Sequence, residues 1–297
     1  MSSSSAVLLL VVAFIFVLSI AAAVWFIWYW RNNMDTGDGG GDGGGAAAGS
    51  TTTTTVAQAV RAGTAALVGG PTALVAAAGP AVVVPAPSGG LIAHLENFLT
   101  VNIRPGMGNA VQHALNKTYR APFPLAATGC VVRFEIKFGP PFEWGCRGKV
   151  GGIHIGPGAA SGGRYSSNGA SHRLMWDRGG GAYAYVYIPS GSAGRQPAPL
   201  RNPGTNGQLV FQRDFAGVFR VGQWYVVELG VRLNTVGAND GVLMLSINGK
   251  RRILNGVVWR LSNLPIQSFS FGVFHGGPCK ATQNSIMNMR NVSVYRW

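Results

Sequence analysis

Hydrophobic and polar positions alternate over short stretches in the C-terminal two-thirds of the chain. The clearest examples are "CVVRFEIKF" (Cys130 to Phe138), "QWYVVELGVRL" (Gln223 to Leu233) and "GVLMLSING" (Gly241 to Gly249). Each is bounded by Gly, Pro or Asn, and no long stretch shows a convincing helical period. The pattern predicts an all-β domain of short strands, a β-sandwich or jelly roll. Within it, "NGK" at Asn248 to Lys250 is a candidate hairpin turn.

The N-terminal part of the chain has a different pattern. Ala6 to Trp30 carries no charge and ends in the aromatic cluster "WFIWYW", as expected of an uncleaved transmembrane helix with rings at the membrane interface. Gly-, Ala-, Thr- and Pro-rich sequence follows, which cannot bury enough side chain to offset the entropy of ordering it. We therefore expect a membrane anchor at 1–31, a linker at 32–90 and the jelly-roll domain at 91–297.

Charge is sparse but one-sided. The chain has 24 Lys and Arg against 10 Asp and Glu, and of the basic residues only Arg31 and Arg61 precede residue 101. Such a balance predicts a polyanionic partner, which could be nucleic acid, an anionic membrane or an acidic polysaccharide. The alternative is a solvated basic surface. Nucleic acid is disfavoured because no DNA- or RNA-binding motif is present and the aromatic residues are built into strands.

Cysteine and histidine spacing does not indicate a metal site. Three cysteines, Cys130, Cys146 and Cys279, fit no zinc-binding pattern. A Cys130 to Cys146 bridge is conceivable, but buried free thiols are the default expectation. The five histidines form no i, i+4 pair, and the sequence contains no P-loop, G-x-S-x-G or dinucleotide fingerprint. No metal or cofactor is expected.

The stretch "SHRLMWDRGGGAYAYVY", from Ser171 to Tyr187, combines two strand patterns around a turn candidate at Asp177 to Gly181. With that turn, Arg173 falls opposite Tyr185, and side chains two apart share a face. A buried aromatic stripe would explain alternating tyrosines. An arginine on the same side argues against it, because a core arginine must find partners for five donors.

Five separated runs of residues carry a resemblance to a known family. They are "WGCRGKVGGIHIG", "SHRLMW", "YAY", "GQWYVVELGVRLNTVGANDGVLMLSINGK" and "FGVFHGGPCKATQNSIMNMRNVSVYRW". In this order, over about Phe98 to Trp297, the chain resembles the family 14 polysaccharide lyases, which include alginate and glucuronan lyases associated with algal viruses.

The resemblance implies a β-jelly roll that cleaves uronic-acid polysaccharides by β-elimination. The lysine of the family's G-K-(L/V)-x-G segment matches Lys149, its Ser-x-Arg matches Ser171 and Arg173, and its Tyr-x-Tyr matches Tyr183 and Tyr185. Two departures affect substrate choice: the usual "KLPGLYGG" is "KVGGIHIG" here, and "FHGG" replaces the usual Phe-Gly-Gly. The expected substrate contacts are therefore Arg173, Lys149, Tyr187, His154 and His275. His172 is expected on the opposite strand face.

The chemistry of elimination gives these residues roles. The proton on C5 of a uronate is weakly acidic, so an enzyme must offset the carboxylate charge, which Arg173 and Lys149 can do. The same cations are expected to lower the pKa of a nearby phenol. Tyr185 is the expected principal base or acid, with Tyr183 as its partner, Ser171 orienting the carboxylate and Lys149 as an alternative base.

These observations predict a membrane-anchored lyase acting on an acidic polysaccharide, with its domain outside a cell or on a virion surface. The alternative is a glycan-binding or structural surface protein with the same fold and no turnover. Two sequons, at Asn116 and Asn291, fit an external domain. Arg31, directly after the apolar segment, weakly favours the opposite orientation.

Overall fold

The computed structural model describes residues 86–108, 113–120, 128–202, 204 and 206–297. The expected anchor at Ala6 to Trp30 and the linker up to residue 85 lie outside these ranges. Within the described ranges, no helix is both long and apolar enough to cross a membrane.

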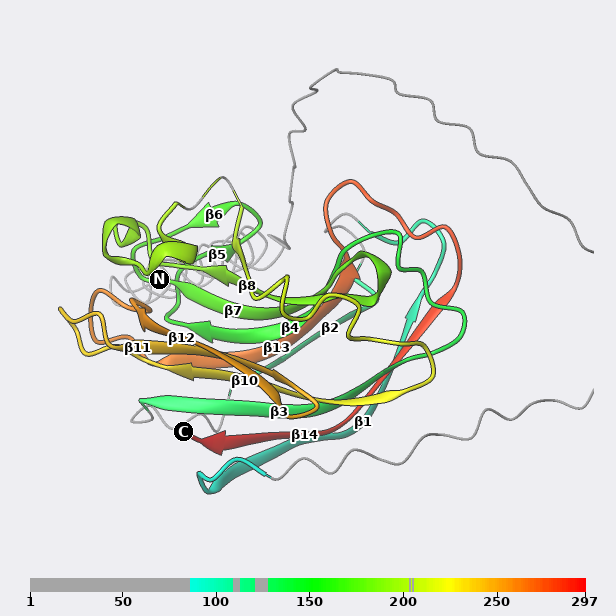
Figure 1. Cartoon of the computed structure of the whole chain (residues 1–297), viewed down its shortest axis with the longest axis horizontal. Helices are drawn as coiled ribbons and strands as arrows, with labels where there is room; N and C mark the ends of the chain where they lie inside the picture. The colour runs from blue at the N-terminus through cyan, green and yellow to red at the C-terminus, as the bar shows by residue number, and fades with distance from the viewer. Residues whose placement is uncertain (1–85, 109–112, 121–127, 203, 205) are drawn as a thin grey trace, which may run out of the picture.

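Two antiparallel sheets of six strands pack face to face, so the predicted all-β sandwich is confirmed (Figure 1). The first sheet has the order β1 (Leu91–Ile103), β14 (Ser285–Arg296), β3 (Gly129–Phe138), β10 (Trp224–Arg232), β11 (Gly241–Ile247) and β12 (Lys250–Val257). The second has the order β2 (Leu115–Tyr119), β13 (Ile266–His275), β4 (Gly148–Ile155), β7 (Ala170–Trp176), β8 (Ala182–Tyr187) and β9 (Gln208–Val210).

Short elements complete the described part of the chain. A small hairpin of β5 (Ala160–Ser161) and β6 (Arg164–Tyr165) lies between β4 and β7 in the sequence. The three 3₁₀ turns are η1 (Arg178–Gly180), η2 (Ala193–Arg195) and η3 (Ala198–Leu200).

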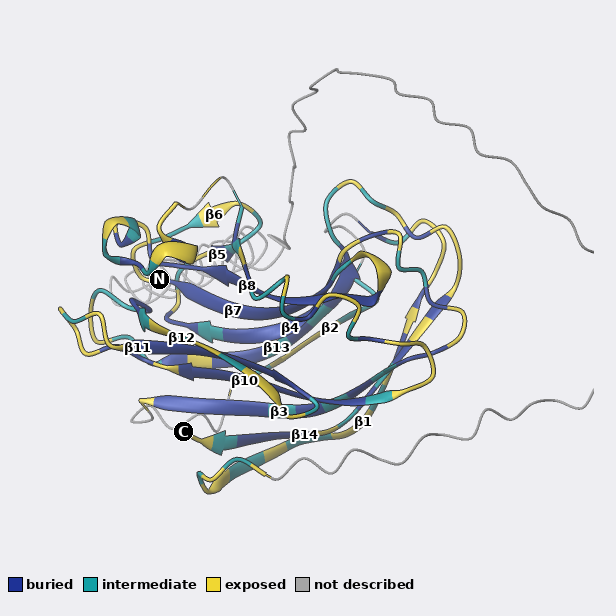
Figure 2. Ribbon diagram, in the orientation of Figure 1, coloured by how far each residue is buried: buried dark blue, intermediate teal, exposed yellow. Residues whose placement is uncertain are grey.

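The core between the sheets follows the strand alternation. On β3, Val132, Phe134 and Ile136 are fully buried and point inward, and Phe269 and Phe271 of β13 meet them from the other sheet, with the Phe134 and Phe271 rings edge to face at 5.5 Å between centroids. Because successive side chains of a strand point to opposite faces, every second residue enters this core. Figure 2 shows the buried strands as the interior of the sandwich.

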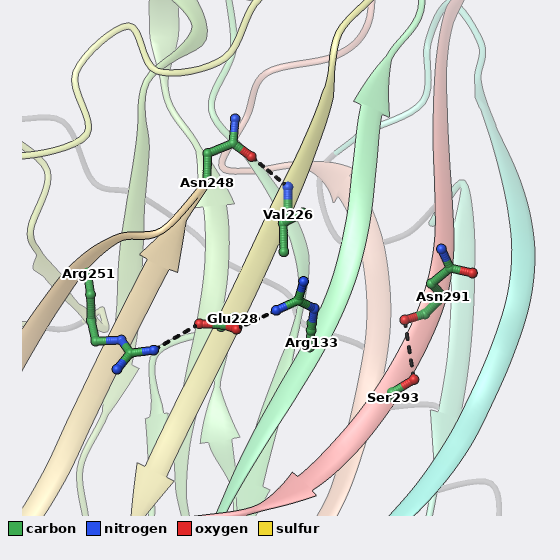
Figure 3. Close-up of polar contacts among 7 residues, drawn as sticks. All are labelled: Arg133, Val226, Glu228, Asn248, Arg251, Asn291 and Ser293. Atoms are coloured by element: carbon green, nitrogen blue, oxygen red, sulfur yellow. Dashed lines mark hydrogen bonds and ion pairs between the residues drawn. The ribbon is translucent and has the colours of Figure 1, made fainter. Parts of the chain in front are cut away.

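The predicted Asn-Gly turn joins β11 to β12. Asn248 and Gly249 both have positive φ, 49° and 80°, as a tight two-residue hairpin requires. The Asn248 side chain also accepts a hydrogen bond from the Val226 backbone N–H at 2.8 Å (Figure 3). The turn is thereby fastened to the neighbouring strand β10.

The outer face of the first sheet carries a buried carboxylate with two cationic partners. Glu228 on β10 accepts from Arg133 Nη1 on β3 at 2.9 Å and lies 3.4 Å from Arg251 Nη2 on β12 (Figure 3). Its side chain is 1% exposed, and a buried charge is tolerated only when paired in this way. This network has a structural role on the sheet that does not carry the hairpin of Ser171 to Tyr187.

The expectation of buried free thiols is confirmed for Cys130 and wrong for Cys146 and Cys279. Cys146 is bonded to Cys279, with 6.0 Å between their Cα atoms, while Cys130 is a free thiol buried in the core, where burial raises its pKa to about 12. The bridge that forms joins segments 133 residues apart in the sequence, a pairing that spacing alone does not reveal.

Candidate active site

The β7–β8 hairpin has the predicted register. Asp177 N–H donates to Gly181 O at 2.7 Å to close the turn, and Arg173 lies opposite Tyr185. On the same face, Ser171 pairs with Tyr187 and Met175 pairs with Tyr183. The polar and aromatic side chains of both strands therefore share the outer face of the second sheet.

The opposite face of β7 enters the core. His172, Leu174 and Trp176 are completely buried there, so His172 points away from the site, as expected. Burial lowers the pKa of His172 to about 3, because a charged imidazole would lose its hydration in the core. His172 is therefore neutral and structural.

A groove of about 580 Å³ lies on the outer face of the second sheet. Its lining includes four of the predicted site residues, Lys149, Tyr183, Tyr185 and Tyr187. The other lining residues are Cys146, Arg147, Gly162, Met175, Arg178, Asn206, Gly207, Leu209, Phe274, Gly276, Gly277, Pro278 and Cys279.

A bulge in β4 places Lys149 in this groove. The register of β4 against β7 shifts between Lys149 and Gly151, so Val150 and Ile153 both enter the core while Lys149 faces outward beside Met175. Without the extra residue, alternation would turn Lys149 inward. Its Nζ lies 5.7 Å from the ring centroid of Tyr185 and 4.8 Å from that of Phe274, close enough for cation–π attraction.

Ser171 and Arg173 lie on the same face but beneath the β5–β6 hairpin. Ser171 Oγ donates to Ala160 O at 2.7 Å, and Arg173 Nη2 donates to the same oxygen at 3.3 Å. Ser171 is fully buried and Arg173 is 7% exposed. A Cβ on Gly152 would lie 2.5 Å from Arg173 Cγ, so this glycine leaves the space that Arg173 occupies. In this geometry the Ser171 hydroxyl is used to hold β5, which differs from its expected contact with a carboxylate.

The tyrosine hydroxyls that meet belong to Tyr185 and Tyr187, which lie 3.3 Å apart. Tyr185 OH also accepts from Gly207 N–H and Tyr187 OH from Gly163 N–H, each at 3.0 Å. Tyr183, the expected partner of Tyr185, instead contacts it ring to ring, edge on, at 6.3 Å between centroids. The hydroxyls in contact are therefore those of Tyr185 and Tyr187, whereas the sequence predicted the pair Tyr183 and Tyr185.

Burial raises the pKa of Tyr185 well above that of a free phenol, and the neighbouring Tyr187 raises it further. This contradicts the expectation that nearby cations lower it. Desolvation is the largest cause of the shift, because an anionic phenolate in this cluster would lose its hydration. Tyr185 is therefore a neutral phenol, suited to donating a proton.

The two histidines expected to touch substrate are not among the groove-lining residues. His154 on β4 lies with Nε2 3.0 Å from Ser270 Oγ on β13. His275 is fully buried and packs edge to face on Trp176 at 5.6 Å between centroids, and burial lowers its pKa. Its neighbour Phe274 takes the groove side, because adjacent strand residues point to opposite faces. The expected substrate contact of His275 is therefore corrected.

Two arginines and a loop of the groove were missed from the sequence. Arg147 stands directly before the "GK" pair and Arg178 directly after Asp177, so their proximity to motif residues was a usable signal. The loop from Gly276 to Cys279 gave no such signal in the sequence, because its position depends on the disulfide. Among the described residues, no three His, Cys, Asp or Glu side chains gather to hold a metal ion.

Comparison with known proteins identifies a family for this chain. The family model of polysaccharide lyase 14 matches residues 100–288. The chain is 27% identical over 218 residues to Exolysin of Paramecium bursaria Chlorella virus 1, covering 65% of this chain and 33% of that protein. It thus spans about a third of the length of this curated relative.

Solved structures show the same fold. The alginate lyase vAL-1 from Chlorella virus superposes with a TM-score of 0.63 at 27% identity, covering 71% of this chain and 89% of that one. The marine alginate lyase from Aplysia kurodai gives a TM-score of 0.57 at 22% identity, with 67% and 83% covered. With the family model matched over most of the β-sandwich, this chain belongs to the polysaccharide lyase 14 family.

Proposed function

We propose that this protein is a membrane-anchored lyase that cleaves a uronic-acid polysaccharide of the alginate or glucuronan type by β-elimination. One observation carries the proposal: a lysine and two tyrosines with their hydroxyls in contact line the same groove, and a nearly buried arginine lies on the adjacent strand. Lys149, Tyr185 and Tyr187 line the groove, and Arg173 lies opposite Tyr185 on the adjacent strand. Family membership and the alginate lyases of similar fold support the same chemistry.

Arg173 prepares the substrate. It offsets the negative charge that builds up on the uronate carboxylate when the C5 proton leaves, in a partly dehydrated site where such attraction is strong. Its guanidinium offers a planar fork to the carboxylate. Binding at Arg173 requires the substrate to compete with the Ala160 carbonyl oxygen for the guanidinium.

Proton transfer follows from the state of the tyrosines. The neutral Tyr185 donates a proton to the leaving oxygen on C4, and Tyr187 supports its hydroxyl through their 3.3 Å contact. Lys149 in its neutral form takes the C5 proton, so the C4–O4 bond breaks as the C4–C5 double bond forms. The products are a new reducing end and an unsaturated uronate.

One assay tests the proposal. The full-length protein is incubated with glucuronan and with alginate, and the ultraviolet absorbance of the unsaturated uronate is followed. We expect the absorbance to rise with the parent and stay flat with Lys149→Ala. No rise with the parent on any polyuronate would reject the lyase function.

A specific observation favours the alternative of a non-catalytic glycan-binding protein. The β5–β6 hairpin covers Ser171 and Arg173, and Ala160 O accepts from both. A surface with this cover binds acidic chains through the cations that line the groove, Lys149, Arg147 and Arg178. Retention of polyuronate without release of unsaturated product would identify this function.

For the location, we propose that the β-sandwich lies outside the membrane-bounded compartment or on a virion surface, with Ala6 to Trp30 as the anchor. The Cys146–Cys279 disulfide supports it, since such bonds persist in oxidising compartments. Both sequon asparagines, Asn116 and Asn291, are exposed. Protease added to sealed cells or intact particles should digest the domain; full protection would contradict this location.

A further inference from the structure

The groove has a cationic end beyond Lys149. Arg147 and Arg178 both line it, on the side where the Cys146–Cys279 disulfide closes the wall. Neither arginine has a part in the elimination chemistry assigned to Lys149, Arg173 and the tyrosines.

Arg147 is held in a fixed orientation. Its Nε donates to Asp177 Oδ1 at 2.8 Å, and its guanidinium carbon lies 5.9 Å from the ring centroid of Tyr183. Its backbone oxygen accepts from Gly276 N–H at 2.7 Å. The side chain is still 46% exposed, so a ligand in the groove can reach it at little cost in side-chain entropy.

The same carboxylate organises Arg178. Its backbone N–H donates to Asp177 Oδ1 at 2.8 Å, at the start of the turn between β7 and β8. Two arginines thus line this end of the groove, and Asp177 offsets only one of their charges, so a net positive charge remains. A negatively charged ligand is attracted there.

A polyuronate carries one carboxylate on every sugar, so a chain bound across the groove brings a second charge near the first. Arg147 and Lys149 are two residues apart in extended chain, about 6.6 Å along the strand direction. A neighbouring carboxylate without a cation would lose its hydration uncompensated. We infer that Arg147 and Arg178 form a second carboxylate site, which binds the uronate adjoining the one that is cleaved and makes the protein prefer long chains.

This inference rests on the proposed function, and its test separates the two. Full-length parent, Arg147→Ala, Arg178→Ala and the double variant are compared on polyuronate and on the shortest oligomer that the parent cleaves. If Arg147→Ala affects folding through loss of the Asp177 contact, Arg147→Lys replaces it, because it keeps the charge. Melting temperatures verify that each variant is folded. Arg232→Ala removes an equal charge from an exposed position on β10, on the other sheet, and serves as the control.

For the double variant on polymer we expect about a tenfold loss in kcat/KM, the size expected for charge-assisted hydrogen bonds. The loss should lie in KM, shrink on the shortest oligomer and fade at high salt. Equal losses on short and long substrates, or no loss beyond that of Arg232→Ala, would overturn the inference. If the parent cuts nothing, the lyase function is rejected. Polymer binding by the parent is then compared with that by the double variant, and equal binding overturns the second carboxylate site.

Discussion

At the scale of single residues, burial decides the chemistry of the phenols. Tyr185 is nearly buried and Tyr187 fully buried, yet both residues line the groove and lie outside the main core. The second hydrophobic cluster, separate from the core, contains these rings with Tyr183, Met175 and Ala160. A tyrosine stripe and a polar site are therefore not alternatives here, since the rings pack together and the same residues line the groove.

The raised pKa of Tyr185 predicts an alkaline limit on turnover. The donor form is the neutral phenol, and a raised pKa keeps it present above pH 10, the ordinary value for tyrosine. The high-pH side of the kcat profile should therefore fall above pH 10, and Tyr185→Phe should reduce kcat by about 10²-fold or more. Measuring initial rates against pH provides the test. A decrease in kcat already at neutral pH would mean that a group other than Tyr185 sets the alkaline limit.

Tyr187→Phe separates the two hydroxyls. Loss of the Tyr187 hydroxyl removes the contacts with Tyr185 and Gly163 but leaves the proton donor in place. We expect kcat to fall less than in Tyr185→Phe, and Tyr183→Phe to affect it least. If Tyr183→Phe is as damaging as Tyr185→Phe, the pair expected from the sequence motif is the correct one.

His172 makes the fold sensitive to acid. Its pKa is lowered to about 3 in the folded state by burial, against about 6.5 when exposed. Because the pKa is lowered in the folded state, stability is unaffected by this group above pH 6.5. The free energy of unfolding then decreases by about 1.4 kcal/mol per pH unit as pH falls from 6.5 toward 3. Urea unfolding at pH 7 and pH 5 should show this loss in the parent. In His172→Leu the difference between the two pH values should be smaller.

At the scale of elements, the site depends on how β4 meets its two neighbours. The register of β4 shifts against β7 and also against β13, and these irregularities turn Lys149 outward. Glycines on β4 let the neighbouring backbones and side chains approach closely. A Cβ on Gly152 would lie 2.3 Å from His172 O and 2.5 Å from Arg173 Cγ.

Gly152→Ala should therefore damage both stability and turnover. The added methyl group must displace the backbone of β7 or the stem of Arg173, a change of the overpacking kind that costs about 1–3 kcal/mol. Thermal unfolding and polyuronate cleavage are the two measurements. Gly194→Ala is the matched control, because a Cβ there meets nothing within 4 Å. Equal melting temperatures for the two variants would contradict the close approach seen at Gly152.

At the scale of the whole molecule, the first strand of the sandwich begins at Leu91. Arg296 N–H donates to Gly90 O at 2.9 Å, so the start of β1 is tied to the last strand. A chain beginning at Ala86 should fold and stay soluble without detergent, because the predicted anchor and linker precede it. Circular dichroism and gel filtration test this. Aggregation of the truncated chain beside a folded full-length protein in detergent would move the boundary.

The sequence alone determined the fold class and much of the site. Alternation along β3, β10 and β11 revealed the sandwich, since side-chain period depends only on local backbone geometry. The Asn-Gly turn and the face shared by Arg173 and Tyr185 followed for the same reason. The family resemblance added Lys149, which strand alternation could not place.

Only the tertiary structure decided the rest. The bulge beside Lys149, the Cys146–Cys279 bond, the cover of Ala160 over Arg173 and the inward turn of His275 all arise between segments distant in sequence. The direction of the Tyr185 pKa shift belongs with them, because desolvation depends on everything packed around the hydroxyl and not on the charges nearby in the sequence. Local pattern assigns a residue to a strand face, whereas register, burial and partners are properties of the assembled sheets.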